Sequence, residues 1–368
     1  MKMKRLLIFI GVIFLIALAA CTTGNPGTSN QPAQVTEDEI VNSPDNNTEN
    51  GQQSNLDKDS DTDSPYVPVQ VRVGVMKGPT AIGLVEFMGK AESEEISSNN
   101  FNFEISAAID EMVPKIVQGN VDIAAVPANM AAVLFNNTQG RVQVLAINTL
   151  GMMYILEKSD VILSVEDLRG KTIFASGKGA SPEFVLNYIL MENGLDPERD
   201  LSIEWKSEHT ECVAALSTND DAIAILPQPF VTIALRSNES IRIALDLNQE
   251  WDRLQETSDN PSALVTGVVI ARSEFASENP EAISDFLDRY AHSVEYVNSN
   301  IVEAAAMVGE YDIVPEAIAR EAIPFCNITF IEGQEMMDKL SGYLSVLFEQ
   351  NPQSVGGSLP SDEFYWFR

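Results

Sequence analysis

The sequence predicts an α/β protein built from two pseudo-repeated lobes that are joined by a two-segment hinge. Residues 105–127 align without a gap to residues 205–227, and both segments contain an amphipathic helix followed by a short apolar strand. Two further apolar segments, 142–147 and 265–270, link the two copies. Because apolar runs of this length after an amphipathic helix are typical of central parallel strands, each copy is expected to form its own open sheet.

Residues 1–20 are expected to be a signal peptide. A basic start is followed by an apolar run over residues 6–20, which is shorter than the roughly 20 residues that a spanning helix needs and fits the core of a secretory signal. The run ends in Leu-Ala-Ala before Cys21, which resembles the lipobox of bacterial lipoproteins and implies lipidation of Cys21. Acyl chains on Cys21 would hold the protein at the outer face of the cell membrane. The alternative is an uncleaved anchor that happens to end in Cys.

Residues 21–66 are expected to be the lipidated Cys followed by a disordered acidic tether. The segment carries nine acidic residues against Lys58, and few apolar residues. So little apolar surface cannot offset the entropy of ordering the chain. A flexible coil of this length reaches roughly 35–40 Å. A functional acidic segment is the alternative to a spacer.

Residues 67–368 are numerous enough for two domains of ordinary size. Their 19 basic and 45 acidic residues give a formal charge of −26. This charge would repel nucleic acid and anionic membrane surfaces, so neither is an expected partner. The charge does not fix the ligand, because local dipoles can oppose the field of the whole protein.

Cysteines and histidines are few. Cys212 and Cys326 follow Cys21, and an exported location permits a disulfide between them, while two buried thiols are the other interpretation. His209 and His292 are the two histidines, and no C-x-x-C or H-x-x-x-H spacing occurs. No metal site and no cofactor are therefore expected.

Each copy is expected to start one strand upstream of the aligned segment. In the first copy a strand over residues 71–75 enters the loop 76–80 and then a single helix. In the second copy a strand over residues 172–175 enters the Gly-rich loop 176–182 and then a helix, with the offset between the copies shifted by one. Chance similarity between two ordinary βαβ units is the alternative to a true duplication.

Two crossings of the chain are expected to form the hinge. The strand over residues 142–147 runs out of lobe one, and the later apolar segment brings the chain back. Lobe one is therefore predicted to comprise residues 67–150 plus 265–368, and lobe two residues 151–264.

Capping signals and periodicity predict further helices. Ser164 and Asp167 are spaced as a capping box. Asn279 is expected to cap a helix that begins at Pro280 and carries apolar residues at helical spacing. Further amphipathic helices are predicted around residues 304–308, 317–322 and 336–348.

One motif resembles a known family. The sequence Ser-x-x-Asp-Leu-x-Gly-Lys over residues 164–171 lies between two predicted strands, and Met-Lys-Gly-Pro-Thr over residues 76–80 follows the first strand. Together with Asp-Ile-Ala before Pro127, these features resemble type II periplasmic binding proteins, in particular the nitrate/sulfonate/taurine and thiamine-precursor binding group. The resemblance covers roughly residues 69–350. It implies a clamshell receptor of an ABC importer whose lobes close around one small solute.

The expected ligand site lies where the two lobes face each other. The loops before the first helix of each copy place backbone N–H groups at the positive end of a helix dipole, which favours a carboxylate, sulfonate or phosphate. Side-chain amides after equivalent strands and threonines on the crossovers add donors and acceptors. The predicted ligand-binding residues are Lys77, Gly78, Thr80, Asn129, Thr149, Ser176, Gly177, Gly179, Ser181, His209, Gln228 and Thr266.

Some residues of this site have a second interpretation. Ser181 is also expected to cap the helix that follows it. Phe230 either stacks on the ligand or belongs to the core of lobe two. His209 is a hydrogen-bond donor in the site, an acid/base partner of Glu208, or a solvated residue beside a helix that Thr210 caps.

The expected function is that of a lipid-anchored extracytoplasmic receptor. It would hand a small anionic or zwitterionic solute, of sulfonate, nitrate, taurine or pyrimidine-precursor type, to the permease subunits of an ABC importer. No catalytic residue is predicted, and the chain is expected to be a monomer and not an enzyme. The alternatives are an enzyme on the same clamshell, of pyrimidine-synthase or menaquinone-pathway type, and a surface sensor without a permease. No Gly-x-x-x-x-Gly-Lys motif and no Ser-His-Asp order supports the enzyme.

Overall fold

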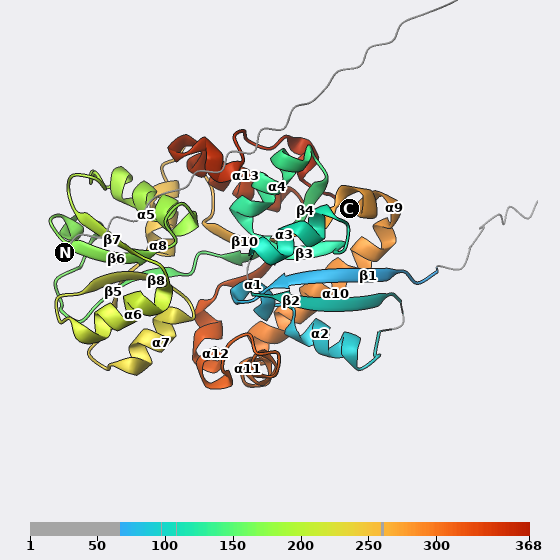
Figure 1. Cartoon of the computed structure of the whole chain (residues 1–368), viewed down its shortest axis with the longest axis horizontal. Helices are drawn as coiled ribbons and strands as arrows, with labels where there is room; N and C mark the ends of the chain where they lie inside the picture. The colour runs from blue at the N-terminus through green and yellow to red at the C-terminus, as the bar shows by residue number, and fades with distance from the viewer. Residues whose placement is uncertain (1–66, 97, 108, 259–260) are drawn as a thin grey trace, which may run out of the picture. The chain divides into compact units, whose positions relative to one another are not determined.

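Strands in the described part of the chain form two separate β-sheets, and helices cover both faces of each sheet (Figure 1). The computed structural model describes residues 67–96, 98–107, 109–258 and 261–368. The predicted signal peptide, the lipidation site Cys21 and the acidic tether lie outside the described residues. The expected α/β class with two pseudo-repeated lobes is confirmed.

The first sheet orders its strands β11-β4-β10-β3-β1-β2. Strand β1 pairs in parallel with β2 and β3, whereas β10 runs antiparallel to β3 and β4. We call this sheet and the helices packed on it lobe one. Its strands are β1 (Gln70–Met76), β2 (Asn100–Ser106), β3 (Ile123–Pro127), β4 (Val142–Leu150), β10 (Val265–Arg272) and β11 (Ile328–Ile331).

The second sheet, which defines lobe two, orders its strands β7-β6-β8-β5-β9. Strand β6 pairs in parallel with β7 and β8, and β5 runs antiparallel to β8 and β9. The pairing pattern is therefore that of lobe one without its last strand. The strands are β5 (Met153–Glu157), β6 (Thr172–Ser176), β7 (Ser202–Lys206), β8 (Ile223–Pro227) and β9 (Arg242–Asp246).

The strand register shows that the two copies of the internal repeat pair equivalent residues. Val73 pairs with Ile123 in lobe one, and Ile173 pairs with Ile223 in lobe two. The offset between the copies is thus the same in both strands of the pair. The expected shift of the offset by one residue in the first strand is wrong, because the copies differ in the loop that follows this strand instead.

The loop after β1 is shorter than its counterpart, and the helix after it is broken. Helix α1 (Pro79–Ile82) ends before Gly83 and Leu84, and α2 (Val85–Glu92) begins after them. Helix α5 (Ser181–Glu192) is continuous in lobe two. The single helix predicted after the first strand is therefore wrong.

The helices of lobe one divide between the two faces of its sheet. Helices α3, α4 and α13 pack on one face, and α1, α2, α10, α11 and α12 pack on the other (Figure 1). The helix that Asn279 and Pro280 were expected to start is α10, and the three amphipathic helices predicted near the end of the chain are confirmed. The bounds are α3 (Ile109–Val117), α4 (Ala128–Thr138), α9 (Ser273–Glu278), α10 (Pro280–Ser299), α11 (Ile301–Glu310), α12 (Glu316–Ala322) and α13 (Gly333–Gln350), with 3-10 turns η2 (Ile323–Phe325), η3 (Pro352–Val355) and η4 (Asp362–Phe364).

In lobe two, α5 and α8 cover one face of the sheet and α6 and α7 cover the other (Figure 1). The predicted capping box is confirmed: the Asp167 carboxylate accepts the Ser164 N–H at 2.9 Å, although the turn that it opens is a 3-10 turn. The bounds are η1 (Val165–Leu168), α6 (His209–Thr218), α7 (Phe230–Ser237) and α8 (Leu247–Gln255).

One hydrophobic core runs through both lobes by way of α13. Helix α13 packs against α5 of lobe two as well as against β4 and β10 of lobe one. The ring of Tyr343 lies 5.7 Å from that of Trp251 on α8, and Gln350 Nε2 donates to the Phe184 carbonyl oxygen at 2.8 Å. The C-terminal helix therefore joins the two lobes in addition to the two crossings of the hinge.

The two described cysteines are buried in separate places. Cys212 belongs to a cluster between α6 and the second sheet, and Cys326 belongs to the core on the α10 face of lobe one. Both are free thiols, so the interpretation as buried thiols is confirmed and the disulfide is not formed. Burial raises the pKa of the Cys326 thiol to about 12.

A buried carboxylate ties three strands of lobe one together. Asp122, which is 2% exposed, accepts hydrogen bonds from Arg72 Nη2 at 2.6 Å and Nε at 2.8 Å, and from Arg272 Nη2 at 3.0 Å. Burial alone would raise the pKa of Asp122, but the bonds from the two guanidinium groups outweigh it and hold this pKa below its usual range. The carboxylate stays ionised inside the fold because both partners are present.

Candidate functional site

Three segments of lobe one bring predicted site residues together. Thr80 follows β1, and its hydroxyl donates to the Met76 carbonyl oxygen at 3.0 Å. Thr149 on β4 is fully buried and donates to Asn148 Oδ1 at 3.0 Å. A Cβ placed on Gly267 of β10 would lie 2.4 Å from Asn148 Oδ1 and 2.7 Å from Thr80 Cγ2. We call these residues, Thr80, Asn148, Thr149 and Gly267, the lobe-one floor.

Sequence reasoning missed two buried polar groups of lobe one, one of them in this floor. Asn148 Nδ2 and the hydroxyl of Ser106, which ends β2, are buried and have no hydrogen-bond partner among the described residues. The phenol of Tyr290 on α10 is buried beside Asn148; burial raises the pKa of this phenol, and the Asn148 side chain opposes the rise. A buried donor without a partner costs roughly 1–3 kcal/mol, so such groups mark a place where water or a ligand completes the bonds. The polar run Asn-Thr after an apolar strand was the signal that could have identified Asn148.

In lobe two the polar groups gather around an imidazole. Ser176 Oγ, at the end of β6, lies 2.5 Å from His209 Nδ1, at the start of α6. The imidazole also packs on the ring of Phe230, with the ring centres 4.7 Å apart. Burial lowers the pKa of His209, although the nearby Glu208 carboxylate opposes that effect. At neutral pH the imidazole is therefore uncharged and can both donate and accept a hydrogen bond.

The start of α6 differs from the expected cap. Glu208 is the N-cap residue, and it forms a capping box with Glu211, whose carboxylate accepts the Glu208 N–H at 3.2 Å. The expectation that Thr210 caps this helix is wrong, because a carboxylate at the N-cap satisfies the first amides and complements the helix dipole. His209 is consequently held at the first turn of α6, with its ring directed to Ser176.

The Gly-rich loop before α5 has the backbone conformation that only glycine adopts without strain. The φ angles of Gly177 and Gly179 are 83° and 80°. The Gly179 N–H, which was expected to face an anionic ligand, donates to the Glu183 carboxylate at 2.6 Å. Ala180, not Ser181, is the N-cap residue, so the expected capping role of Ser181 is wrong.

Ser181 instead contacts a predicted site residue of the other lobe. Its hydroxyl lies 3.4 Å from Asn129 Oδ1, which is at the start of α4 in lobe one. Asn129 is buried and its Nδ2 lies 3.4 Å from the Ser354 carbonyl oxygen. The phenol of Tyr343 on α13 is fully buried beside Ser181, and burial raises its pKa to about 12 although the Ser181 hydroxyl opposes this rise. We call the region around the Ser181–Asn129 contact the interlobe seam.

Two predicted residues at the start of α1 are placed differently from the expectation. The Lys77 ammonium is paired with the Asp312 carboxylate at 2.8 Å, at an exposed position. Gly78 has a φ of 129° and precedes a helix of only four residues, so few aligned peptide dipoles point at it. The anion-binding geometry expected here is therefore weaker than in lobe two.

The side chains of Gln228 and Thr266 form hydrogen bonds that stabilise the segments around them. Gln228 Oε1 accepts the Thr232 hydroxyl at 2.9 Å and so fixes the start of α7. The Thr266 hydroxyl donates to the Leu150 carbonyl oxygen at 2.7 Å and joins the two crossings of the hinge. Gln228 Nε2 forms no bond with any described residue and is the group of this pair that can still donate to a ligand.

Two of the lysines near the seam are already paired, whereas Lys178 of the Gly-rich loop makes no hydrogen bond or ion pair with any described residue. Besides Lys77, Lys206 at the end of β7 lies 3.2 Å from the Glu204 carboxylate and 4.9 Å from the ring centre of Phe174. The groups left at the seam are hydroxyls, amides, backbone N–H groups and a neutral imidazole. An anionic ligand group would therefore be held by neutral donors and helix dipoles, with the unpaired Lys178 in the same loop.

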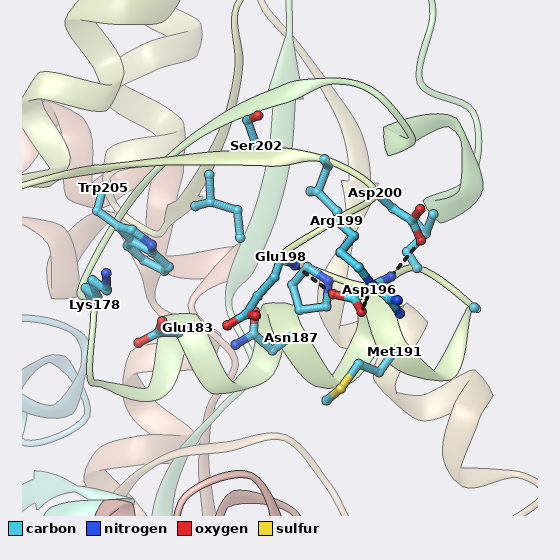
Figure 2. A pocket seen from close by; sticks show the side chains of 15 residues that line it. Lys178, Glu183, Asn187, Met191, Asp196, Glu198, Arg199, Asp200, Ser202 and Trp205 are labelled. Atoms are coloured by element: carbon cyan, nitrogen blue, oxygen red, sulfur yellow. Dashed lines mark hydrogen bonds and ion pairs between the residues drawn. The ribbon is translucent and has the colours of Figure 1, made fainter.

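A hollow of 890 Å³ lies beside the Gly-rich loop, on lobe two, and not at the seam (Figure 2). It runs between α5 and β7, and Lys178 and Glu183 connect it to the loop. None of the predicted ligand-binding residues lines it.

Two α/β lobes that share one internal repeat, with the starts of α4 and α5 in contact between them, define a two-lobed solute-binding protein. The profile of the family described as ABC transporter, phosphonate, periplasmic substrate-binding protein matches residues 93–308. The chain belongs to this family, and its function is that of the periplasmic substrate-binding component of an ABC importer. The predicted resemblance to this class of binding proteins is confirmed.

Solved structures share the fold. A crystal structure of an ABC transporter from Parabacteroides distasonis is 22% identical, with a TM-score of 0.67, and the match covers 81% of this chain and 99% of that one. The periplasmic aliphatic sulphonate binding protein SsuA from Escherichia coli is 15% identical, with a TM-score of 0.65 and coverage of 82% and 93%. The periplasmic nitrate-binding protein NrtA from Synechocystis PCC 6803 is 15% identical, with a TM-score of 0.53 and coverage of 80% and 83%. At these identities the likeness concerns the fold alone.

No curated protein matches the sequence. Among the described residues, no helix combines the length and the apolar character that crossing a membrane requires.

Proposed function

We propose that this protein is a lipid-anchored receptor that binds a small anionic or zwitterionic solute at the interlobe seam and delivers it to its permease. The observation that supports this most is the Ser181–Asn129 contact, which joins the starts of α5 and α4 from opposite lobes. Two helix starts facing one point attract negative charge. The neutral hydroxyls and amides around them fit the uncharged parts of the same solute.

The proposed contacts fall into three groups. Ser181 and the backbone amides of the Gly-rich loop other than that of Gly179, which Glu183 engages, would hold the anionic group. The lobe-one floor, with Asn148 added to the predicted residues, would bond the polar groups on the other side of the solute. Ser176 and His209, whose imidazole packs on Phe230, would contact the remaining edge of the solute. Lys77 and Thr266 are assigned supporting roles, because their polar groups are engaged within the protein.

The attachment and the organisation of the chain are part of the same proposal. Lipidation at Cys21 and a tether over residues 21–66 would keep the receptor at the outer face of the membrane, and Cys21→Ser should release it into the soluble fraction. We propose that the lobes divide as residues 67–150 plus 265–368 and residues 151–264, and that the protein is monomeric. The charge of −26 on residues 67–368 supports the absence of a nucleic-acid partner.

A ligand screen followed by paired variants tests the proposed function. Sulfonates, phosphonates, nitrate, pyrimidine precursors and flavins are screened by thermal shift, because a ligand that binds the folded state raises the Tm. The affinity of the best ligand is then measured with Thr80→Ala and Ser181→Ala combined. A combination of Ser93→Ala and Thr218→Ala removes two exposed hydroxyls at helix ends and is the control.

We expect at least about a tenfold loss of affinity in the first double variant, since two hydrogen bonds at about 1 kcal/mol each are removed, and no change in the control. Unchanged affinity in the first double variant would show that the solute does not bind at the seam.

A further inference from the structure

The hollow on lobe two has two walls of different character (Figure 2). Glu183, Asn187 and Met191 follow one another at intervals of four residues along α5, so they line the same side of the helix. Ile203 and Trp205 alternate along β7 and form the opposite wall. Because β7 is an edge strand of its sheet, no further strand covers this side of the hollow.

The internal repeat shows that an open hollow is not required by the fold. Ile203 and Trp205 correspond to Phe103 and Ile105 on the edge strand β2 of lobe one. There, Phe103 packs edge-on against Phe87 of α2, with the ring centres 5.1 Å apart. Lobe one therefore fills the corresponding space with aromatic side chains, whereas lobe two leaves it open in front of an indole.

Several polar groups that line the hollow are free to bind a ligand. The side chains of Lys178, Asn187 and Glu198 make no hydrogen bond or ion pair with any described residue, and neither does the indole N–H of Trp205. Lys178 and Trp205 lie at one end of the hollow in the view of Figure 2, and Asn187 and Glu198 lie between them and Asp196. An ammonium, an amide, a carboxylate and an aromatic face are thus presented to one space.

The charged groups at the other end of the hollow are already neutralised within the protein. Arg199 donates to Asp196 at 2.6 Å, and Arg169 pairs with Asp200 at 2.7 Å. That end provides a closed polar rim and leaves the free groups near Trp205 as the ones that can recognise a ligand.

The mixture of free groups selects the chemistry of the ligand. A free anion would meet Glu183 and Glu198, and a free cation would compete with the Lys178 ammonium. A hydroxyl group donates one hydrogen bond and accepts two, so a polyol satisfies the ammonium, the amide and the carboxylate together. The C–H face of a pyranose ring packs on an indole, because the aromatic side chain offers an apolar face with a polar edge.

We propose that this hollow is a second binding site, which takes a neutral saccharide stacked on Trp205 and hydrogen-bonded to Asn187 and Glu198. Its volume lies within the range of about 300–1,000 Å³ found for small-ligand sites and accommodates a short oligosaccharide. The site is separate from the interlobe seam, and its occupation does not depend on the identity of the transported solute.

Titration of the full-length protein with chitotriose, cellotriose and maltotriose tests the proposal. The indole N–H resonance of Trp205 is followed by NMR, and the affinity is measured by calorimetry. We expect one trisaccharide to shift this resonance and to leave those of Trp251 and Trp366 in place. Tetramethylammonium chloride and sodium sulfate are titrated as a cation and an anion, and neither should compete with the sugar.

Variants separate stacking from a structural effect. Trp205→Ala should abolish sugar binding, and Asn187→Ala and Glu198→Gln should each weaken it at least about fivefold, the loss expected for one hydrogen bond of about 1 kcal/mol. Phe367→Ala, which removes an exposed aromatic ring, and Glu166→Gln, which neutralises an exposed carboxylate, are the matched controls and should leave binding unchanged.

Three results would overturn the proposal. The first is that no trisaccharide binds the wild-type protein. The second is that sugar binding survives Trp205→Ala or both polar variants, whose folding is checked by circular dichroism. The third is that the cation or the anion shifts the Trp205 resonance and displaces the sugar. None of these results would affect solute binding at the seam, which is measured on the same samples.

Discussion

Adding one methyl group at Gly267 tests the packing of the lobe-one floor. In Gly267→Ala the new Cβ would lie 2.4 Å from Asn148 Oδ1 and 2.7 Å from Thr80 Cγ2, which is far inside contact distance. Neither neighbour can move freely, because Asn148 Oδ1 accepts the Thr149 hydroxyl and the Thr80 hydroxyl donates to the backbone. The methyl group therefore either strains the floor or breaks one of these bonds.

The size of the effect follows from opposing contributions. Overpacking of a buried site costs about 1–3 kcal/mol, and a lost hydrogen bond costs about 1 kcal/mol. Ala also lowers the conformational entropy of the unfolded chain relative to Gly, and this stabilises the folded state by about 0.4–1 kcal/mol. We expect Gly267→Ala to lower the free energy of unfolding by about 1–3 kcal/mol and to weaken solute binding at the seam.

Gly89→Ala is the matched control, since it makes the same chemical change inside α2. The nearest atom to the new Cβ would be Tyr311 Oη at 3.8 Å, an ordinary contact. Ala is preferred over Gly in a helix interior, so this variant should gain about 0.5–1 kcal/mol. Urea unfolding measures the free energy of unfolding of both variants. A shift of the midpoint urea concentration with an unchanged m-value reports a change in stability. If Gly267→Ala is as stable as the wild type, the floor is loosely packed and the reasoning fails.

Two further predictions concern buried titratable groups. Asp122→Asn leaves Arg72 and Arg272 without their buried partner and should lower the free energy of unfolding in urea by about 3–5 kcal/mol. Asp312→Asn is the control: its carboxylate is 97% exposed, and the variant should lower the free energy of unfolding by less than about 1 kcal/mol. Equal effects of the two variants would contradict the structure. The pKa of His209 lies below its ordinary value of 6.5 in the folded protein, so the unfolded chain binds the proton first and stability falls as the pH drops from about 6.5 towards the folded pKa. Replacing His209 by Asn should therefore reduce the loss of Tm between about pH 7.5 and 5.5. An equal loss of Tm in the wild type and in His209→Asn would show that the pKa of His209 is not lowered in the folded protein.

Local patterns in the sequence predicted the elements of the fold well. The repeat of apolar strands after amphipathic helices gave the two sheets, because parallel central strands are apolar on both faces whatever surrounds them. The Gly-rich loop before α5 was predicted from the sequence, whereas the positive φ angles of Gly177 and Gly179 were found only in the structure. The broken helix after β1 was missed, because Gly83 and Leu84 interrupt a pattern that otherwise has helical period.

The site was predicted less completely. The sequence indicated which loops would face the seam, because helix starts after parallel strands lie at one edge of a sheet. It did not indicate that Lys77 would be neutralised by Asp312 or that Glu183 would bond the Gly179 amide. Asn148 was also missed, since its importance comes from burial and from the missing partner of its Nδ2 atom.

By itself, the sequence determined the repeated α/β units, the position of the Gly-rich loop and the class of binding protein, all of which depend on residues close together along the chain. Only the tertiary structure decided which donors remain free, since the partner of Lys77 lies 235 residues away and Ser181 reaches Asn129 across 52 residues. It also decided that lobe two keeps an open hollow where lobe one packs aromatic rings. Hydrogen bonds and close packing act over a few ångströms in space, and no local pattern encodes which distant segments will meet.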